Sequence, residues 1–274
     1  MSTSENKSIS ILGCGWLGLP LGIHLKDTYS IKGSTTASEK LPLLRKAGIQ
    51  PFTLVVNQEM KVNPEFLYSD ILIINIPPQI RKHGVQYHID QIKTLIPHIE
   101  KSSIKWVIYT SSTSIYPSPN DEVEESLKIT EENTGNQTLL TVEQLLLKNK
   151  HFDTTILRLA GLFGPDRTLV KHFAGKKNLS TGDTQVNLVH REDVISCISE
   201  IIRQEKKNDI FNICADLHPM RKDLYTCLAK RAELEKPEYA KVENIPPYKI
   251  ISNQKIKEGL SYEFQHPDPM GFPL

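Results

Sequence analysis

Three glycines near the start of the chain have the spacing of a phosphate-binding loop. Gly13, Gly15 and Gly18 form a GxGxxG pattern directly behind an apolar run, Ile9–Leu12, and directly ahead of a predicted helix, Trp16–Lys26. Glycine permits a sharp turn, close approach of backbone N–H groups to a pyrophosphate, and tight packing of the helix on its strand. The helix N-terminus adds positive potential for the phosphates. The pattern predicts dinucleotide binding, with an ordinary strand–helix turn as the alternative. The predicted contacts are Gly13, Cys14, Gly15, Trp16, Leu17 and Gly18.

A run of hydroxyl side chains follows the predicted strand Trp106–Thr110. In an open parallel sheet, ligands bind at the carboxyl ends of the strands, so we expect these hydroxyls to face the coenzyme. Ser112 and Tyr116 are the catalytic candidates. Capping of the strand end by the same hydroxyls is the alternative. Further coenzyme contacts are predicted from this strand end and the one before it: Ile76, Pro77, Thr110 and Ser111.

The residues at the end of the second predicted strand bear on the choice of coenzyme. An NAD-selective site usually carries an acidic side chain about twenty residues past the glycines. Here segment 32–38 reads KGSTTAS, and the first carboxylate is Glu39. Hydroxyls with Lys32 or Lys40 nearby suit a 2′-phosphate better. We therefore predict NADP(H), with NAD(H) as the alternative coenzyme and helix capping as the alternative role of the hydroxyls. The predicted contacts are Ser34, Thr35 and Thr36.

Four segments together resemble one enzyme superfamily. They are residues 110–116 (TSSTSIY), 157–165 (LRLAGLFGP), 187–194 (NLVHREDV) and 211–214 (FNIC). In this order they resemble the extended short-chain dehydrogenase/reductases of the NAD-dependent epimerase/dehydratase type. The chain looks closest to the atypical YeeZ-like group, which shares the GxGWLGxPL start. The resemblance implies a Rossmann fold, a nicotinamide coenzyme, a homodimer and a substrate-orienting role for Ser112.

The chain departs from that family at its acid–base pair. The family uses a tyrosine and, one helical turn later, a lysine, whose ammonium group lowers the tyrosine pKa. The corresponding region here, residues 134–143, reads TGNQTLLTVE and contains neither residue. Another group would have to move the proton: Tyr116, His83 or His190. Each has a plainer explanation, as a packed aromatic, a loop residue or a residue capping the following helix. Arg158, Arg167 and Lys171 are candidates for binding an anionic group or for solvated surface charge.

Apolar runs and helical patterns alternate along the chain, which predicts a doubly wound parallel sheet. The fold class is therefore α/β, of Rossmann type, with a small C-terminal substrate lobe. We place the dinucleotide-binding domain at residues 1–165 and most of the lobe at 166–274, with 187–214 returning to the sheet. A helix from Val85 to Ile99 is expected to be kinked or shortened by Pro97. A helix over Asn253–Gly259 is expected to be capped by Ser252. The predicted strands are Ile9–Leu12, Tyr29–Ser34, Phe52–Val56, Ile71–Ile76, Trp106–Thr110, Thr155–Leu159 and Asp209–Cys214.

The composition narrows the class of protein. A net charge of +1 gives no electrostatic reason to expect a nucleic-acid or membrane partner. The polar start of the chain does not resemble a signal peptide, and the four cysteines lack metal-site spacing, so we expect a cytoplasmic protein with reduced thiols. His83, His88 and His98 have no spacing suited to a shared metal, and no metal is predicted.

Three functions compete. The first is an NADP-dependent oxidoreductase or epimerase-like enzyme acting on a small polar substrate, for which the resemblance makes a nucleotide-linked compound one option. The second is a non-catalytic NADP(H)-binding regulatory or redox-sensing protein, suggested by the missing Tyr–Lys pair. The third is a nucleotide-sugar dehydrogenase, suggested by the GCGWLGLPLG start. It ranks last because those enzymes are much longer and use a catalytic cysteine.

Overall fold

The apolar run ahead of the glycine loop forms strand β1 (Ser8–Leu12), which lies inside a seven-stranded sheet. The structure is a computed structural model that describes residues 7–272. On one side β1 pairs in parallel with β2 (Ser30–Thr35), and on the other with β4 (Ile71–Ile74). All four residues of β4 are buried, as expected for a parallel strand covered on both faces.

The strand order of this sheet is β10-β7-β5-β4-β1-β2-β3, and the strands are parallel. The order reverses between β1 and β4, so the predicted doubly wound Rossmann topology is confirmed. Ligands of such sheets bind outside the carboxyl ends of the strands at this reversal. The four further strands are β3 (Gln50–Thr53), β5 (Trp106–Ser112), β7 (Asp153–Leu159) and β10 (Ile210–Ile213).

The chain divides into two compact units, and it passes between them several times. The first contains the residues up to Ser111, together with Asn136–Leu157 and Ile201–Ile210. The second contains Ser112–Gly135, Arg158–Glu200 and the residues from Phe211 onward. This division differs from the predicted boundary after residue 165, because segment 112–135 already belongs to the second unit.

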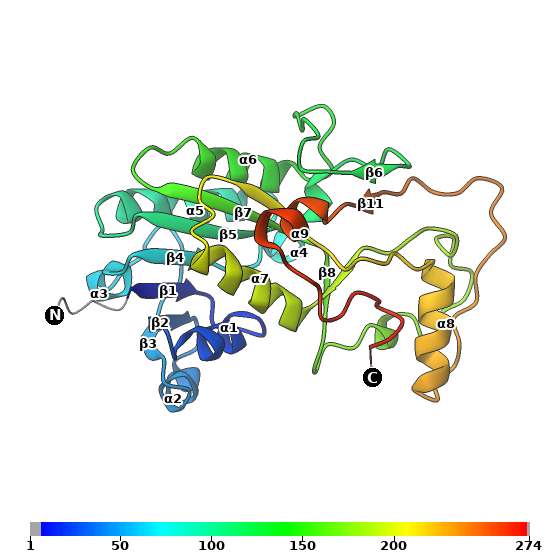
Figure 1. The fold of residues 1–274 in the computed structure, drawn as a ribbon, viewed down its shortest axis with the longest axis horizontal. Coiled ribbons are helices and arrows are strands. Elements are labelled where there is room, and N and C mark those ends of the chain that lie inside the picture. Colours follow the sequence, from blue (N-terminus) through cyan, green and yellow to red (C-terminus); the bar gives the residue numbers. More distant parts are fainter. Residues whose placement is uncertain (1–6, 273–274) are drawn as a thin grey trace. The chain divides into compact units, whose positions relative to one another are not determined.

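In the first unit, helix α1 (Gly18–Leu25) packs on the strands that flank the glycine loop (Figure 1). A Cβ at Gly22 would lie 2.7 Å from the side chain of Ile49 and 3.3 Å from that of Ile11, so only glycine permits this closeness. Helices α5 and α6 pack against each other. Besides α1, the helical segments of this unit are η1 (Ser38–Lys40), α2 (Leu41–Lys46), α3 (Pro64–Leu67), α4 (Ile80–His83), α5 (Gln86–Glu100) and α6 (Gln137–Leu147).

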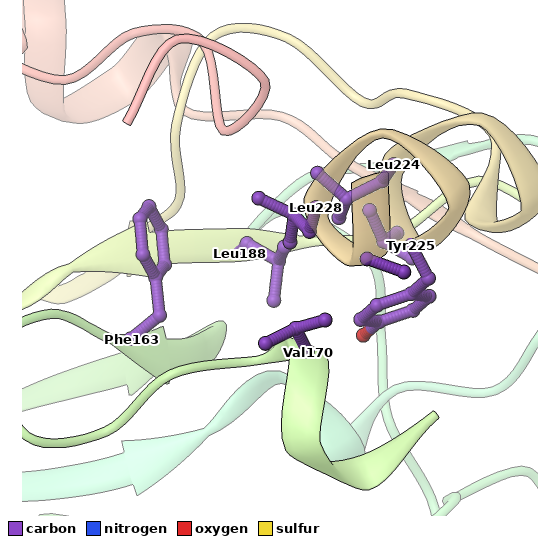
Figure 2. Close-up of a cluster of buried hydrophobic side chains, with 8 residues drawn as sticks. Phe163, Val170, Leu188, Leu224, Tyr225 and Leu228 are labelled. Carbon is purple, nitrogen blue, oxygen red and sulfur yellow. The ribbon is translucent and has the colours of Figure 1, made fainter. Parts of the chain in front are cut away.

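The second unit has an apolar core of its own, in which side chains of helix α8 (Arg221–Arg231) cluster with side chains of strands β8 (Gly161–Phe163) and β9 (Leu188–His190) (Figure 2). The rings of Phe173 and Tyr225 stack with their centroids 3.8 Å apart. The labelled core side chains are Phe163, Val170, Leu188, Leu224, Tyr225 and Leu228. The remaining elements are η2 (Thr113–Ile115), β6 (Glu122–Val123), η3 (Val170–His172), α7 (Arg191–Arg203, of which the last three residues belong to the first unit), β11 (Ile250–Ile251) and α9 (Gln254–Leu260).

Local expectations differ from the structure at three places. Strand β3 covers Gln50–Thr53 and not Phe52–Val56. Pro97 was expected to kink or shorten its helix; the helix is not shortened, because α5 continues to Glu100 and the proline lies within its last turn. Helix α9 begins at Gln254 behind Asn253, and no side chain caps it, so Ser252 is not its N-cap. Within residues 7–272, no helix is both long and apolar enough to cross a membrane.

Candidate functional site

The glycine loop is held by polar side chains from two other strand ends of the first unit. Gly13 has φ of +102°, and its N–H donates to Ser34 Oγ at 3.1 Å. Its carbonyl accepts a hydrogen bond of 3.0 Å from Asn75 Nδ2. The N–H of Cys14 donates to the carbonyl of Ser34 at 2.8 Å. The loop is therefore tied to the ends of both β2 and β4, the strands on either side of β1.

The three loop glycines have different surroundings. A Cβ at Gly13 would lie 2.5 Å from the carbonyl oxygen of Asn75, and a Cβ at Gly18 would lie 2.2 Å from that of Gly13. Gly15 differs, because it is exposed and a Cβ there would meet nothing within 4 Å. Gly13 and Gly18 thus allow the tight turn, and Gly15 presents bare backbone to open space ahead of helix α1. This is the arrangement in which a loop backbone can approach a pyrophosphate.

Three other residues of the loop have packing roles that the sequence did not reveal. The Cys14 side chain is buried against Gly33, and burial raises the pKa of its thiol to about 12. A thiol with such a pKa stays protonated and unreactive at neutral pH. Leu17 is also buried, and Trp16 is half-buried.

The hydroxyls proposed for a 2′-phosphate do not share one environment. Ser34 is buried, and its hydroxyl already accepts the N–H of Gly13. Thr35 Oγ1 accepts the N–H of Ala37 at 3.2 Å, a turn contact ahead of η1. No side chain caps η1, so the alternative of helix capping is not supported for these hydroxyls. Thr36 is exposed, as is Lys40. Lys32 is committed elsewhere, since its Nζ donates to the carbonyls of Glu65, at 2.8 Å, and Tyr68.

Asn75 was missed by the sequence reasoning. It follows four buried apolar residues of β4 and uses both ends of its amide: Nδ2 donates to Gly13, and Oδ1 accepts from Thr110 Oγ1 at 3.2 Å. Its position, a polar residue directly after an apolar strand, could have indicated a role at the carboxyl end of that strand. Of the predicted contacts that follow it, Ile76 lies against Gly13, where its Cγ2 would be 3.2 Å from a Cβ, and Pro77 is exposed.

At the end of β5, Ser111 forms a hydrogen bond to helix α6. Its hydroxyl donates to Glu143 Oε1 on α6 at 2.5 Å, and both side chains are buried. The neighbouring Thr110 hydroxyl also donates to the carbonyl of Ile74 at 3.2 Å. The predicted coenzyme contacts Thr110 and Ser111 are therefore parts of the hydrogen-bond network that orders this edge of the sheet.

The catalytic candidates lie in the second unit. Ser112 is half-buried, and its Oγ accepts the N–H of Ser114 at 3.1 Å, which begins η2. Tyr116 is fully buried. Its hydroxyl donates to Asn212 Oδ1 at 2.8 Å and accepts from Arg158 Nη1 at 2.8 Å. Burial raises the pKa of Tyr116 despite the opposing effect of Arg158. To exchange a proton with a substrate, this hydroxyl would have to leave its network.

A half-buried carboxylate belongs to the same network. Glu125 Oε1 accepts the N–H of Asn212 at 2.6 Å, and burial raises the pKa of Glu125. The Asn212 amide also donates to the carbonyl of Ser252 at 3.1 Å. Arg158 is only 5% exposed, and its guanidinium lies 4.8 Å from the centre of the Tyr116 ring. This arginine therefore has a packing role, whereas Arg167 and Lys171 are exposed.

Two carbonyl oxygens exclude a side chain at Gly135, which lies near the start of the segment that lacks the Tyr–Lys pair. A Cβ at this position would lie 2.4 Å from the carbonyl oxygen of Tyr116 and 2.6 Å from that of Ser114. The Gly135 N–H donates to the carbonyl of Ile115 at 2.9 Å, and the Thr134 hydroxyl donates to the same oxygen. The backbone of segment 134–135 therefore lies directly on that of segment 114–116.

The other proton-transfer candidates have different environments. His83 is exposed and stacks on Tyr87 with ring centroids 4.3 Å apart. His190 is 1% exposed, and burial together with the charge of His266 lowers its pKa to about 4. Its Nδ1 lies 3.4 Å from the N–H of Glu192, in the helix-capping position considered as the plainer alternative.

Lys249 was also missed by the sequence reasoning. Its Nζ donates to the carbonyl of Tyr116 at 2.6 Å. Burial lowers the pKa of this lysine, and no carboxylate within residues 7–272 forms an ion pair with it. No sequence motif marks it, since it lies in an irregular segment just before β11.

Comparison with known proteins now identifies the family. Protein YeeZ of Escherichia coli strain K12 is 32% identical to this chain over 98% of the chain and 99% of YeeZ. The chain belongs to the NAD-dependent epimerase/dehydratase family. The model of that family matches residues 85–214, a region that contains all four of the segments in which the sequence resembles the family.

Solved structures of related fold agree with this assignment. A conserved protein of unknown function from Silicibacter pomeroyi superposes with a TM-score of 0.78 at 19% identity, covering 96% of this chain and 95% of that one. UDP-glucuronic acid 4-epimerase from Bacillus cereus, solved with UDP-glucuronic acid and NAD, superposes with a TM-score of 0.76 at 18% identity and covers 94% of each chain. The chain thus has the Rossmann fold of these structures.

Proposed function

We propose that this chain is an NADP(H)-dependent oxidoreductase or epimerase-like enzyme that acts on a small, polar, nucleotide-linked substrate. The observation that carries the proposal is the open space at Gly15, between two glycines at which any side chain would clash. A nicotinamide coenzyme, when bound, supplies hydride transfer. The residues of the chain bind and orient: the loop 13–18 holds the diphosphate, and Asn75 fixes the loop.

The coenzyme preference rests on what surrounds the second strand end. Segment 34–38 offers hydroxyls and no carboxylate. Ser34 and Lys32 already have hydrogen-bond partners within the protein, whereas Thr36 and Lys40 are exposed. A cationic Lys40 and the Thr36 hydroxyl suit a 2′-phosphate. The related UDP-glucuronic acid 4-epimerase was solved with NAD, so this preference is a distinguishing feature of the proposal.

The substrate class is supported by the second unit. Lys249 provides a half-buried positive charge, and Arg167 and Lys171 provide exposed ones. Cations of this kind suit a diphosphate-linked substrate. The B. cereus epimerase binds UDP-glucuronic acid, a substrate of that chemical class.

A coenzyme titration tests the proposal. Trp16 lies in the proposed phosphate loop and is one of two tryptophans, so NADPH should quench its emission, and the Trp16→Phe variant, which retains Trp106, should lose most of the signal. We expect NADPH to bind at least tenfold more tightly than NADH. Gly15→Ala should melt at the wild-type temperature but bind NADPH at least tenfold more weakly, whereas Gly259→Ala on α9 should bind normally. Undiminished binding by Gly15→Ala would contradict the loop assignment.

Turnover needs a separate assay. An epimerase returns the hydride to its substrate, so no net change in NADPH absorbance is expected, and products of a nucleotide-sugar panel must be separated by chromatography. Conversion that is lost in Ser112→Ala supports the enzyme.

The alternative is a non-catalytic sensor of the NADP redox state, which is favoured by the absence of a tyrosine and a lysine from residues 134–143. Such a protein would bind NADP⁺ and NADPH with different affinities and convert nothing on the panel. Equal affinity for the two forms would contradict the sensor.

A further inference from the structure

Three residues in the second unit bring metal-binding atoms together, although they are far apart in the sequence. His190 ends β9, Glu192 lies in the first turn of α7, and His266 lies in the segment after α9. One ligand atom from each lies within 4.8 Å of the other two. His266 Nε2 is 2.9 Å from Glu192 Oε2, and His190 Nδ1 is 3.7 Å from the same oxygen. The spacing of histidines along the sequence gave no sign of this group, because its three residues come from separate segments.

The His190 imidazole is buried without adequate hydrogen bonds. Its ring lies 4.3 Å from that of Phe272 and 5.3 Å from that of Phe163, measured between centroids. Nδ1 has one long contact, the 3.4 Å approach of the Glu192 N–H, and Nε2 has no hydrogen-bond partner among the described residues. A buried polar atom in this state is costly and calls for an explanation. The nitrogen that lies near the Glu192 carboxylate is Nδ1, and its lone pair, engaged by only that one long contact, is the one that a metal ion would coordinate.

The position of His266 is fixed independently of its contact with Glu192. Asp193 is fully buried, and its carboxylate accepts three hydrogen bonds from segment 262–266. The donors are the Tyr262 hydroxyl at 2.9 Å, the Gln265 N–H at 2.7 Å and the His266 N–H at 3.0 Å. This carboxylate holds the segment against the first turn of α7, so the two imidazoles meet edge to face, with ring centroids 3.9 Å apart, before any ion binds.

The donor set and its access indicate the type of ion. Two imidazoles and one carboxylate, with a further position left for water, are a common zinc-binding set. At zinc–ligand distances of about 2.1 Å, ligands in a tetrahedral site are about 3.4 Å apart. The two distances to Glu192 Oε2, 2.9 and 3.7 Å, are close to this value, and the two imidazole nitrogens lie within 4.8 Å of each other. Glu192 is 52% exposed and His266 is 25% exposed, which leaves one side open to solvent.

We propose that His190, Glu192 and His266 form a binding site for one zinc ion, with water completing the coordination. The Glu192 carboxylate provides the negative charge in direct contact with the ion. Asp193 adds a second negative charge nearby, which offsets the positive charge of Arg191 and of the α7 N-terminus. The site is independent of coenzyme binding, so it can be tested whether or not the proposed enzymatic function holds.

The experiment is a titration of the untagged, EDTA-treated full chain with Zn²⁺ at pH 7.5 by calorimetry, repeated with Co²⁺ by visible absorption. We expect one ion per chain with a dissociation constant in the micromolar range or below. Glu192→Gln and His266→Gln should each weaken binding at least tenfold. The matched controls Glu258→Gln and His172→Gln, both at exposed positions, should bind like the wild type.

Thermal melting with and without Zn²⁺ separates a metal site from a purely structural ion pair. The metal should raise the melting temperature of the wild type and of the controls, but not that of Glu192→Gln. Because Glu192 is half exposed, this variant carries the test even if His266→Gln fails to fold. The proposal is overturned if the wild type shows no saturable binding, or if Glu192→Gln binds Zn²⁺ as tightly as the wild type does.

Discussion

Arg158 and Tyr116 form a buried pair: Arg158 Nη1 donates to the Tyr116 hydroxyl at 2.8 Å, and the guanidinium lies 4.8 Å from the centre of the tyrosine ring. Both residues come from segments that resemble family motifs, and each could have been assigned a part in the chemistry. Instead, they satisfy each other inside the second unit, with Asn212 as the further partner of the hydroxyl. Their arrangement favours a structural role for both.

The variant Tyr116→Phe tests this role. It removes two hydrogen bonds, one of them to a charged group, and leaves Asn212 Oδ1 buried without that donor. We expect the free energy of unfolding to fall by about 2 kcal/mol, measured by urea denaturation. Coenzyme affinity should be unchanged. If Tyr116 were the proton donor of an enzyme, the variant would instead keep its stability and lose at least a hundredfold in kcat.

Asn75→Asp tests how the glycine loop is held. The substitution keeps the shape of the side chain but replaces the Nδ2 donor to the Gly13 carbonyl by an acceptor. It also places a negative charge beside the proposed diphosphate. We expect the dissociation constant of NADPH to rise at least tenfold, which corresponds to about 1.4 kcal/mol.

The matched control is Asn149→Asp. Asn149 also donates a hydrogen bond through Nδ2, to Glu100 Oε1 at 2.7 Å, but it lies in another part of the first unit. It should leave NADPH affinity unchanged. Equal affinity of Asn75→Asp and the wild type would mean that the loop does not depend on this amide.

Gly135→Ala tests the close backbone contact that excludes a side chain at this position. Its Cβ would meet two carbonyl oxygens, at 2.4 and 2.6 Å, and backbone must shift to admit it. We expect a loss of about 2 kcal/mol in the free energy of unfolding, the usual cost of overpacking. Gly15→Ala, which meets nothing within 4 Å, is the comparison and should unfold like the wild type. A stable Gly135→Ala protein would show that segment 134–135 can move away from segment 114–116.

The pH dependence of stability should reveal the buried His88. Its ring bonds the Tyr109 hydroxyl at 2.9 Å and Gln91 Oε1 at 3.1 Å, and burial lowers its pKa below the ordinary value of 6.5. The unfolded chain therefore binds more protons than the folded chain as the pH falls below about 6.5. The stability linked to His88 is complete above that pH and is lost as the pH falls towards the folded pKa.

Urea denaturation between pH 7.5 and 5 measures this effect. His88→Gln should have a lower stability at pH 7.5 but lose less of it on acidification than the wild type does. The exposed control His151→Gln should follow the wild-type curve. Identical slopes for His88→Gln and the wild type would show that this histidine does not contribute.

Much of the fold could be predicted because it depends on local pattern. The apolar run of β4, the glycine spacing and the alternation of strands with helices each identify an element without knowledge of its neighbours. The error at Ser252 was one of a single position, because helix α9 begins at Gln254 and Asn253 precedes it.

The candidate site was predictable only in part. The loop glycines were found from their spacing, but their separate roles depend on whether another carbonyl lies opposite each one, as it does at Gly13 and Gly18 and not at Gly15. Asn75 and Lys249 were missed because neither belongs to a motif. Their partners lie 62 and 133 residues away in the chain.

The amino-acid sequence by itself determined the Rossmann topology, the glycine loop and the family, because these follow from periodicity and from contiguous motifs. Only the tertiary structure decided which polar groups are already bonded to one another and which remain open. It showed that Tyr116 is bonded within a buried network, and that His190, Glu192 and His266 lie together. The physical reason is that hydrogen bonding and coordination depend on distances of a few ångströms between side chains, which sequence separation does not specify.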